Sequence, residues 1–69
     1  MRYAIVIEKG SKNCSACVPD LTGCVSAGST VSQTEENTRE AISFHIDGLK
    51  EDGFPVPEPT TIPEYIETA

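Results

Sequence analysis

Residues 18–30, with the sequence VPDLTGCVSAGST, divide this chain into a part that must be extended and a part that can be helical. Pro19 has no backbone N–H and cannot donate to a sheet ladder, so it ends a strand or lies at an edge or bulge. At the other end, Ser29 and Thr30 are residues that cap helices, and Gln33 follows Thr30 at the capping-box spacing. The stretch therefore marks the passage from sheet to helix.

Short apolar segments before and inside this stretch predict a meander of three antiparallel strands. The segment 2–9, RYAIVIEK, is rich in β-branched and aromatic residues, which is typical of a strand. It is apolar on both alternating faces, so we expect a central strand that is covered on both sides. A turn over 10–13 leads to a second strand over 14–18, and a turn over 20–23 leads to a third strand over 24–27.

The pattern after Thr30 predicts one amphipathic helix that begins at Val31 and stops at Gly53. Glu35 and Arg39 have the i, i+4 spacing of a helical ion pair. One side of this helix is mostly apolar and the other is acidic. The first side comprises Val31, Thr34, Thr38, Ala41, Ile42, His45 and Leu49, and the second comprises Glu36, Glu40, Ser43, Asp47 and Glu51.

Four prolines in residues 54–63 predict an extended, semi-rigid strap. Residues 64–68, EYIET, predict a short last strand. A helix between two strands usually returns the chain parallel to the first, so the last strand is expected beside the first one. The expected fold class is α+β: a two-layer β-β-β-α-β arrangement with a four-stranded sheet and one helix, in a single domain over residues 1–69.

The charge and hydropathy of the chain argue against several function classes. Eleven acidic and five basic residues give a net charge of −6, which argues against direct binding to nucleic acid, whose phosphates favour Lys and Arg. The same charge favours a cationic protein partner, or simply a well-solvated surface. No stretch approaches the roughly 20 apolar residues of a membrane span. The N-terminal apolar run is too short for a signal peptide, so a cytoplasmic location is expected.

Three cysteines and one histidine are the candidates for metal or redox chemistry. Cys14 and Cys17 have C-x-x-C spacing, but residues three apart on a strand point to opposite faces. Only Cys24 and His45 remain as further ligands, which is too few for a convincing zinc site. We expect reduced thiols, no metal and no cofactor. His45 is interpreted as a partly buried histidine rather than a general base, because no nucleophile lies near it in sequence.

One helix can cover only one face of a sheet, yet the first strand is apolar on both of its faces. Tyr3, Ile5 and Ile7 point one way, whereas Ala4 and Val6 point the other way. Nothing else in the chain can cover the second face. We therefore expect this face to meet another copy of the chain or a protein partner.

Several longer motifs span nearly the whole chain: YAIVIEK, SACVPDLTGCVSAGST, EENTREAISFHIDGLKEDGFPVPEP and EYIE. They resemble the HicB-like antitoxin family of small bacterial proteins, most specifically in VPDL-x-GC and in REAI-x-x-H-x-x-GL-x-EDG-x-P-x-P. The resemblance implies a partial ribonuclease H-like fold. It also implies binding to a small basic HicA-type toxin, which cleaves mRNA, and assembly into homodimers or higher homo-oligomers.

Two features depart from the family pattern. Antitoxins of this kind often carry a C-terminal DNA-binding domain, and this chain stops at Ala69, so operator binding is not expected of it. Cysteines occupy positions 14 and 17, where the family commonly has tyrosines. A ribonuclease H-like nuclease would need clustered carboxylates for two metal ions. The first strand offers only Glu8, at its end, so no enzymatic activity is expected.

The sequence is therefore interpreted as a HicB-like antitoxin that neutralises a HicA-type toxin by stoichiometric contact, with no catalysis, nucleic-acid binding or membrane binding. The alternative is a solitary oligomeric scaffold or regulatory protein without a toxin, and a thiol-based metal or redox protein is a more distant third. Asp20 and Gly23 are expected to shape the turn, Gly23 with a positive φ. The residues expected at a partner or oligomer interface are Tyr3, Ile5, Ile7, Pro19, Asp20, Leu21 and Phe44.

Overall fold

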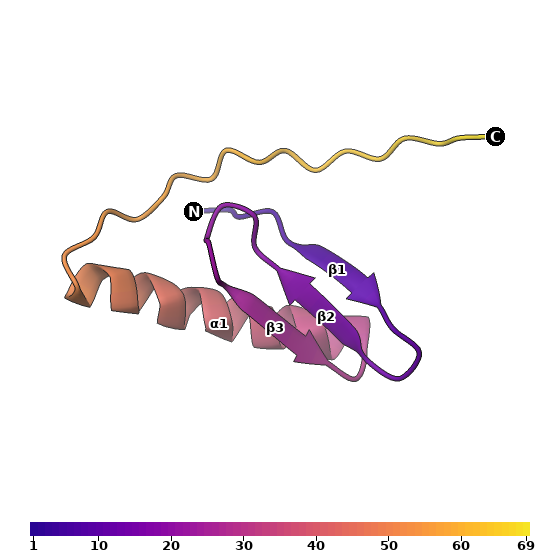
Figure 1. Cartoon of the computed structure of the whole chain (residues 1–69), viewed down its shortest axis with the longest axis horizontal. Helices are drawn as coiled ribbons and strands as arrows, with labels where there is room; N and C mark the ends of the chain where they lie inside the picture. The colour runs from indigo at the N-terminus through magenta and orange to yellow at the C-terminus, as the bar shows by residue number, and fades with distance from the viewer.

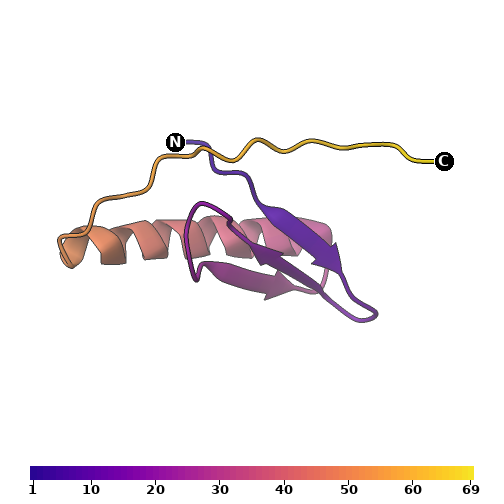
Figure 2. The same cartoon turned by 45° about the horizontal axis from the view of Figure 1, so that its top comes forward.

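The computed structural model describes all of residues 1–69, as three strands, one helix and an extended C-terminal segment (Figure 1). The elements are β1 (Val6–Lys9), β2 (Cys14–Cys17), β3 (Val25–Gly28) and α1 (Val31–Glu51). The strands form one antiparallel sheet in the order β1-β2-β3. α1 packs across one face of this sheet and leaves the other face open (Figures 1 and 2). The predicted α+β class is confirmed.

The four-stranded sheet is not formed, because residues 54–69 run extended without joining a ladder. This segment contains Pro55, Pro57, Pro59 and Pro63, and none of these has the backbone N–H that a ladder needs. As a consequence β1 is an edge strand, and the prediction of a central first strand is wrong. β1 is also shorter than predicted. In the register that pairs Val6 with Cys17, residue 4 would lie opposite Pro19, which has no N–H to donate.

The register decides which side chains share a face of the sheet. Ile7 lies opposite Ala16, which is buried, so both face α1. Val6, Cys17 and Val25 lie side by side across the three strands, and all three are exposed on the open face. The predicted unpartnered face therefore exists.

The core lies between α1 and the sheet and contains few residues. Val18, Leu21 and Cys24 form its centre, with exposed fractions of 3%, 1% and 4%. Thr34 and Thr38 are also buried, and each hydroxyl donates to the backbone carbonyl four residues earlier, at 2.7 and 2.6 Å. Because these hydroxyls are satisfied within the helix, the two threonines can face an apolar layer without an unpaired polar atom.

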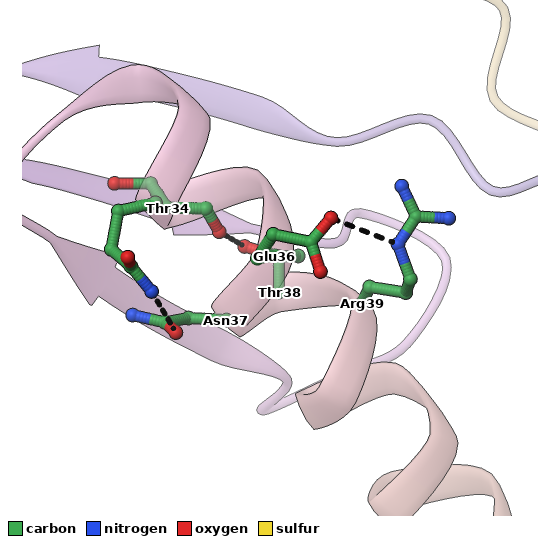
Figure 3. A network of polar contacts seen from close by, with 6 residues as sticks. Thr34, Glu36, Asn37, Thr38 and Arg39 are labelled. Carbon is green, nitrogen blue, oxygen red and sulfur yellow. Dashed lines mark hydrogen bonds and ion pairs between the residues drawn. The ribbon is translucent and has the colours of Figure 1, made fainter.

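α1 begins at Val31 as predicted, but the side-chain contacts of its first turns differ from the predicted ones (Figure 3). Thr30 Oγ1 accepts a hydrogen bond from the Gln33 backbone N–H at 3.0 Å. The Gln33 side chain donates to Asn37 at 2.9 Å rather than reaching back to the cap, so the capping box is only half formed. Arg39 lies 3.8 Å from Glu36, three residues earlier, instead of pairing with the carboxylate four residues earlier. Both ends of this ion pair are exposed, so the cap stabilises the helix start more than the pair does.

The C-terminal end of α1 is a Schellman motif at Gly53, which confirms the predicted stop. The backbone N–H of Gly53 donates to the Lys50 carbonyl at 3.2 Å, and that of Phe54 donates to the Leu49 carbonyl at 2.9 Å. The φ of Gly53 is +76°, in the left-handed region that favours glycine. The chain then turns back along the sheet as the strap (Figure 2). α1 is not apolar enough over its length to cross a membrane.

Candidate protein-binding surfaces

The turn between β2 and β3 is closed by three backbone hydrogen bonds. Val18 N–H donates to the Cys24 carbonyl at 3.1 Å, while Leu21 and Cys24 donate to the carbonyls of Val18 and Leu21 at 3.0 Å each. Gly23 has a φ of +82°, as predicted. This geometry turns Leu21 into the core and leaves Pro19 in solvent. Leu21 is 1% exposed, so its side chain supports the turn and is not available to a partner.

Asp20 lies in this turn, and its carboxylate binds the strap. Its Oδ2 accepts from the backbone N–H groups of Thr60 and Thr61 at 3.1 and 3.0 Å, and its Oδ1 accepts from their hydroxyls at 3.1 and 2.8 Å. We call these three residues the Asp20 clasp. The hydrogen bond from the Thr61 backbone, followed by that from its hydroxyl, holds the pKa of Asp20 below its ordinary value.

Tyr3 provides a second attachment for the strap. Its hydroxyl donates to the Pro57 carbonyl at 2.6 Å. Burial, and then the negative charges of Glu58 and Asp20, raise the pKa of Tyr3, so the phenol stays a proton donor at neutral pH. Tyr3 and Asp20, which were predicted at an interface, thus both bind the strap of their own chain.

The remaining predicted interface residues lie on different sides of the molecule. Ile5 and Ile7 face α1 and are half-buried, and Ile5 packs against the core. Phe44 lies on α1 and is 83% exposed, beside a shallow hollow that it shares with Val25 and His45. The seven residues therefore do not form one patch.

The open face of the sheet includes three residues that are not among the seven predicted at an interface. Val6 and Val25 are 47% and 67% exposed, and Cys17 lies between them on β2. The sequence predicted that alternate residues of each strand lie on opposite faces of the sheet. It did not predict which face α1 would cover, because β1 is apolar on both faces.

A hollow of about 590 Å³ lies between the N-terminal segment and α1, beyond the edge of β1. Its apolar wall includes Ile5, Ile42 and Ile46, and its charged members include Arg2, Arg39 and Lys50. We call this hollow the cationic groove. No feature of the sequence pattern predicts it, because its walls are some 40 residues apart in the chain.

The opposite side of α1 carries the exposed acidic residues predicted for it. Glu36, Glu40, Asp47 and Glu51 are all in solvent. We call these four residues the acidic helix face. Such a surface attracts and orients a cationic partner at long range.

The thiols lie as their spacing predicts. Cys14 is buried under α1 and Cys17 is exposed on the open face, so they point to opposite faces of the sheet. Burial raises the pKa of the Cys24 thiol, which makes it a poor nucleophile at neutral pH. The structure contains no group of three or more His, Cys, Asp or Glu side chains placed to hold a metal ion.

The arrangement is a two-layer α+β domain with an open sheet face, a cationic groove and an acidic helix face. Residues 3–69 match the model of the family described as HicB_like antitoxin of bacterial toxin-antitoxin system. The chain belongs to this family.

Two relatives extend this comparison. An uncharacterized 14.9 kDa protein in the rep-hol intergenic region of Haemophilus phage HP1 is 47% identical over 66 residues, which cover 96% of this chain and 50% of the phage protein. The chain thus spans about half the length of this curated relative. A chain of the solved HicA3 and HicB3 toxin-antitoxin complex superposes with a TM-score of 0.76 at 38% identity, over 88% of this chain and 71% of that one.

Proposed function

We propose that this protein is an antitoxin that binds and neutralises a HicA-type toxin by stoichiometric protein contact, without catalysis. The observation that carries the proposal is the superposition on a chain of the HicA3–HicB3 complex, at a TM-score of 0.76 and 38% identity. Membership of the HicB-like family supports the same role. The net charge of −6 suits a small basic partner and disfavours direct contact with nucleic acid.

The acidic helix face is the surface that we propose for the toxin. Its carboxylates are exposed and lie away from the core, so they can meet a cationic protein without disturbing the fold. Phe44 lies on the same helix at 83% exposure and offers an apolar anchor beside them. Charge would speed the encounter and the aromatic side chain would add affinity.

The experiment is co-expression with a small basic HicA-type toxin, scored by growth rescue and by co-purification. Glu40→Lys should weaken binding and rescue. The matched control is Glu8→Lys, which makes the same charge change at an exposed site on the open face of the sheet. The proposal fails if the folded wild-type protein neither rescues growth nor co-purifies, or if the two variants lose binding equally.

A solitary oligomeric scaffold is the second candidate function. The exposed valines of the open face favour it, because they suit contact between copies whether or not a toxin exists. A stable oligomer by light scattering, together with no bound toxin in the co-expression experiment, would favour this candidate.

A further inference from the structure

A small apolar hollow lies between α1 and the start of β3, which forms the opposite edge of the sheet from β1 (Figure 1). Phe44 and Val25 border this hollow and are 83% and 67% exposed. Ala41 and His45 line it from the helix, and the buried Cys24 connects it to the core. Two exposed apolar side chains from different elements, beside a recess that reaches the core, mark a site for another molecule.

The size of the hollow and the state of the β3 edge indicate that a partner would insert a side chain here. The volume of the hollow is about 230 Å³, which is below the roughly 300–1,000 Å³ of pockets that bind small molecules. Along β3, the Asn37 side-chain amide donates to the Ala27 carbonyl at 2.7 Å, so this edge is partly closed to an added strand. A protein partner would therefore contact side chains rather than pair with the backbone.

Acidic side chains flank Phe44 on the helix surface. Glu40 lies four residues before it and Asp47 three residues after it, so both are its neighbours on α1. Both carboxylates are exposed. An apolar centre within a polar rim is the usual anatomy of a protein interface. The complementary partner presents an apolar side chain surrounded by lysines or arginines.

The recess on the other side of α1 has the opposite charge. Arg2, Arg39 and Lys50 line the cationic groove on the β1 side, and Lys9 lines the hollow that continues it. These are four of the five basic residues of the chain. Glu35 is the only acid in either lining. A basic partner is therefore repelled from the β1 side of α1 and attracted to the β3 side.

We propose that a HicA-type toxin docks on the β3 side of α1 and inserts one apolar side chain into the hollow between Phe44 and Val25. Lysines or arginines around that side chain meet Glu40 and Asp47. This contact rests on the proposed function and deepens it. It adds β3 to the toxin-binding surface, leaves the β1 side free and defines the chemistry that the toxin must present.

A cationic protein fits this hollow better than the chain's own C-terminal segment or a second copy does. No residue of 54–69 lines the hollow, because Tyr3 and Asp20 hold the strap elsewhere. In a symmetric contact between two copies, the acidic rims around the two hollows would face each other. Each chain also has a net charge of −6, which adds to the repulsion.

Isothermal titration calorimetry of the full chain with a small basic HicA-type toxin tests the site. Phe44→Ala should raise Kd about tenfold or more with unchanged circular dichroism, because the ring is in solvent and alanine favours a helix. Phe54→Ala removes a 60% exposed ring from the strap and is the matched control, which should leave Kd unchanged. Val25→Lys should also weaken binding, whereas Val6→Lys, on the same face of the sheet but two strands away, should not.

Failure of the docking site and failure of the antitoxin function give different results. A folded wild-type protein that binds no HicA-type toxin overturns both. Wild-type binding, with the same Kd in each variant as in its control, overturns the docking site alone. If Phe44→Ala dissociates an oligomer of the toxin-free protein in sedimentation equilibrium, a second copy occupies the hollow and the docking site is wrong.

A double-mutant cycle tests whether one toxin side chain contacts both residues. Phe44→Ala combined with Val25→Ala should raise Kd by less than the product of the two separate effects, because either change alone already removes part of the same contact. Effects that multiply would mean that the two residues bind the toxin separately, which contradicts insertion into a shared hollow.

Discussion

At the β3 edge of the sheet, α1 approaches so closely that only a glycine fits, whereas at the β1 edge the same helix leaves the cationic groove. A Cβ placed on Gly28 would lie 2.8 Å from both the backbone nitrogen and Oγ1 of Thr34. At the other edge, the space between Ile5 and the helix reaches about 590 Å³. One helix therefore makes a tight contact and a loose one with a sheet of only three strands.

The size and charge of the side chains explain this difference. Toward β3, α1 presents Thr34, which is buried and whose hydroxyl donates to the Thr30 carbonyl. Toward β1, α1 presents Ile42 and Ile46, and these are flanked by Arg39 and Lys50. The charged ends of Arg39 and Lys50 need either water or an acidic partner beside them. The β3 side is thus tightly packed, and the β1 side leaves an open hollow.

The largest effect should come from the centre of the core. Leu21→Ala removes a side chain that is 1% exposed, and we expect a loss of about 2–5 kcal/mol in the free energy of unfolding. Urea denaturation followed by circular dichroism measures it. Thr22→Ala, at the exposed neighbouring position, should change stability by no more than about 0.5 kcal/mol. Similar losses in both variants would mean that the turn does not anchor the core.

Gly28→Ala tests the tight contact directly. The added methyl group meets Thr34 backbone, so the helix must shift, and we expect a loss of about 1–3 kcal/mol in unfolding free energy. Gly48→Ala is the matched control: nothing lies within 4 Å of a Cβ there, and the residue is inside α1. Because alanine favours helix over glycine, this control should gain about 0.5–1 kcal/mol. A neutral Gly28→Ala would contradict the close approach.

The same substitution at two neighbouring residues, Ile5 and Val6, compares the two faces of the sheet. Ile5→Asp places a carboxylate against the core and should reduce unfolding free energy by about 1–2 kcal/mol. Val6→Asp places the same group on the open face, where Val6 is 47% exposed, and should change stability by about 0.5 kcal/mol or less. Thermal unfolding of the two variants measures the difference. The reverse order would mean that α1 covers the other face.

The smallest effect is expected at the Asp20 clasp, which attaches the strap locally. The pKa of Asp20 is lowered in the folded chain, so its contribution is present above the ordinary carboxyl pKa of about 3.9 and is lost as the pH falls through the lowered value. The amide signals of Thr60 and Thr61 should be unchanged from pH 7 to 5 and move only below about pH 4.

Asp20→Asn should speed hydrogen exchange at the Thr60 and Thr61 amides at pH 7, because the charge that strengthens their bonds is lost. Glu8→Gln, at an exposed carboxylate on the open face, is the control and should leave both amides unchanged. Protection of the two amides in Asp20→Asn at the wild-type level would show that the strap is held by other contacts.

Local features of the fold were predictable because they depend on short-range chemistry. Thr30 and Gly53 set the ends of α1, since a cap and a left-handed residue act within one turn. The buried side of the helix followed from the spacing of residues such as Thr34, Ile42 and Leu49. The side-chain pairs did not follow, because Arg39 could reach either of two neighbouring carboxylates.

The motifs of the sequence determined the family, the strand–turn–strand meander and the amphipathic helix. Only the tertiary structure decided that β1 lies at an edge, that the Asp20 clasp joins residues 40 positions apart, and that the cations gather in one groove. Hydrogen bonds between neighbours in sequence are fixed by local geometry. Contacts between distant segments depend on how the whole chain packs, and in a chain that buries few residues small differences in packing decide them.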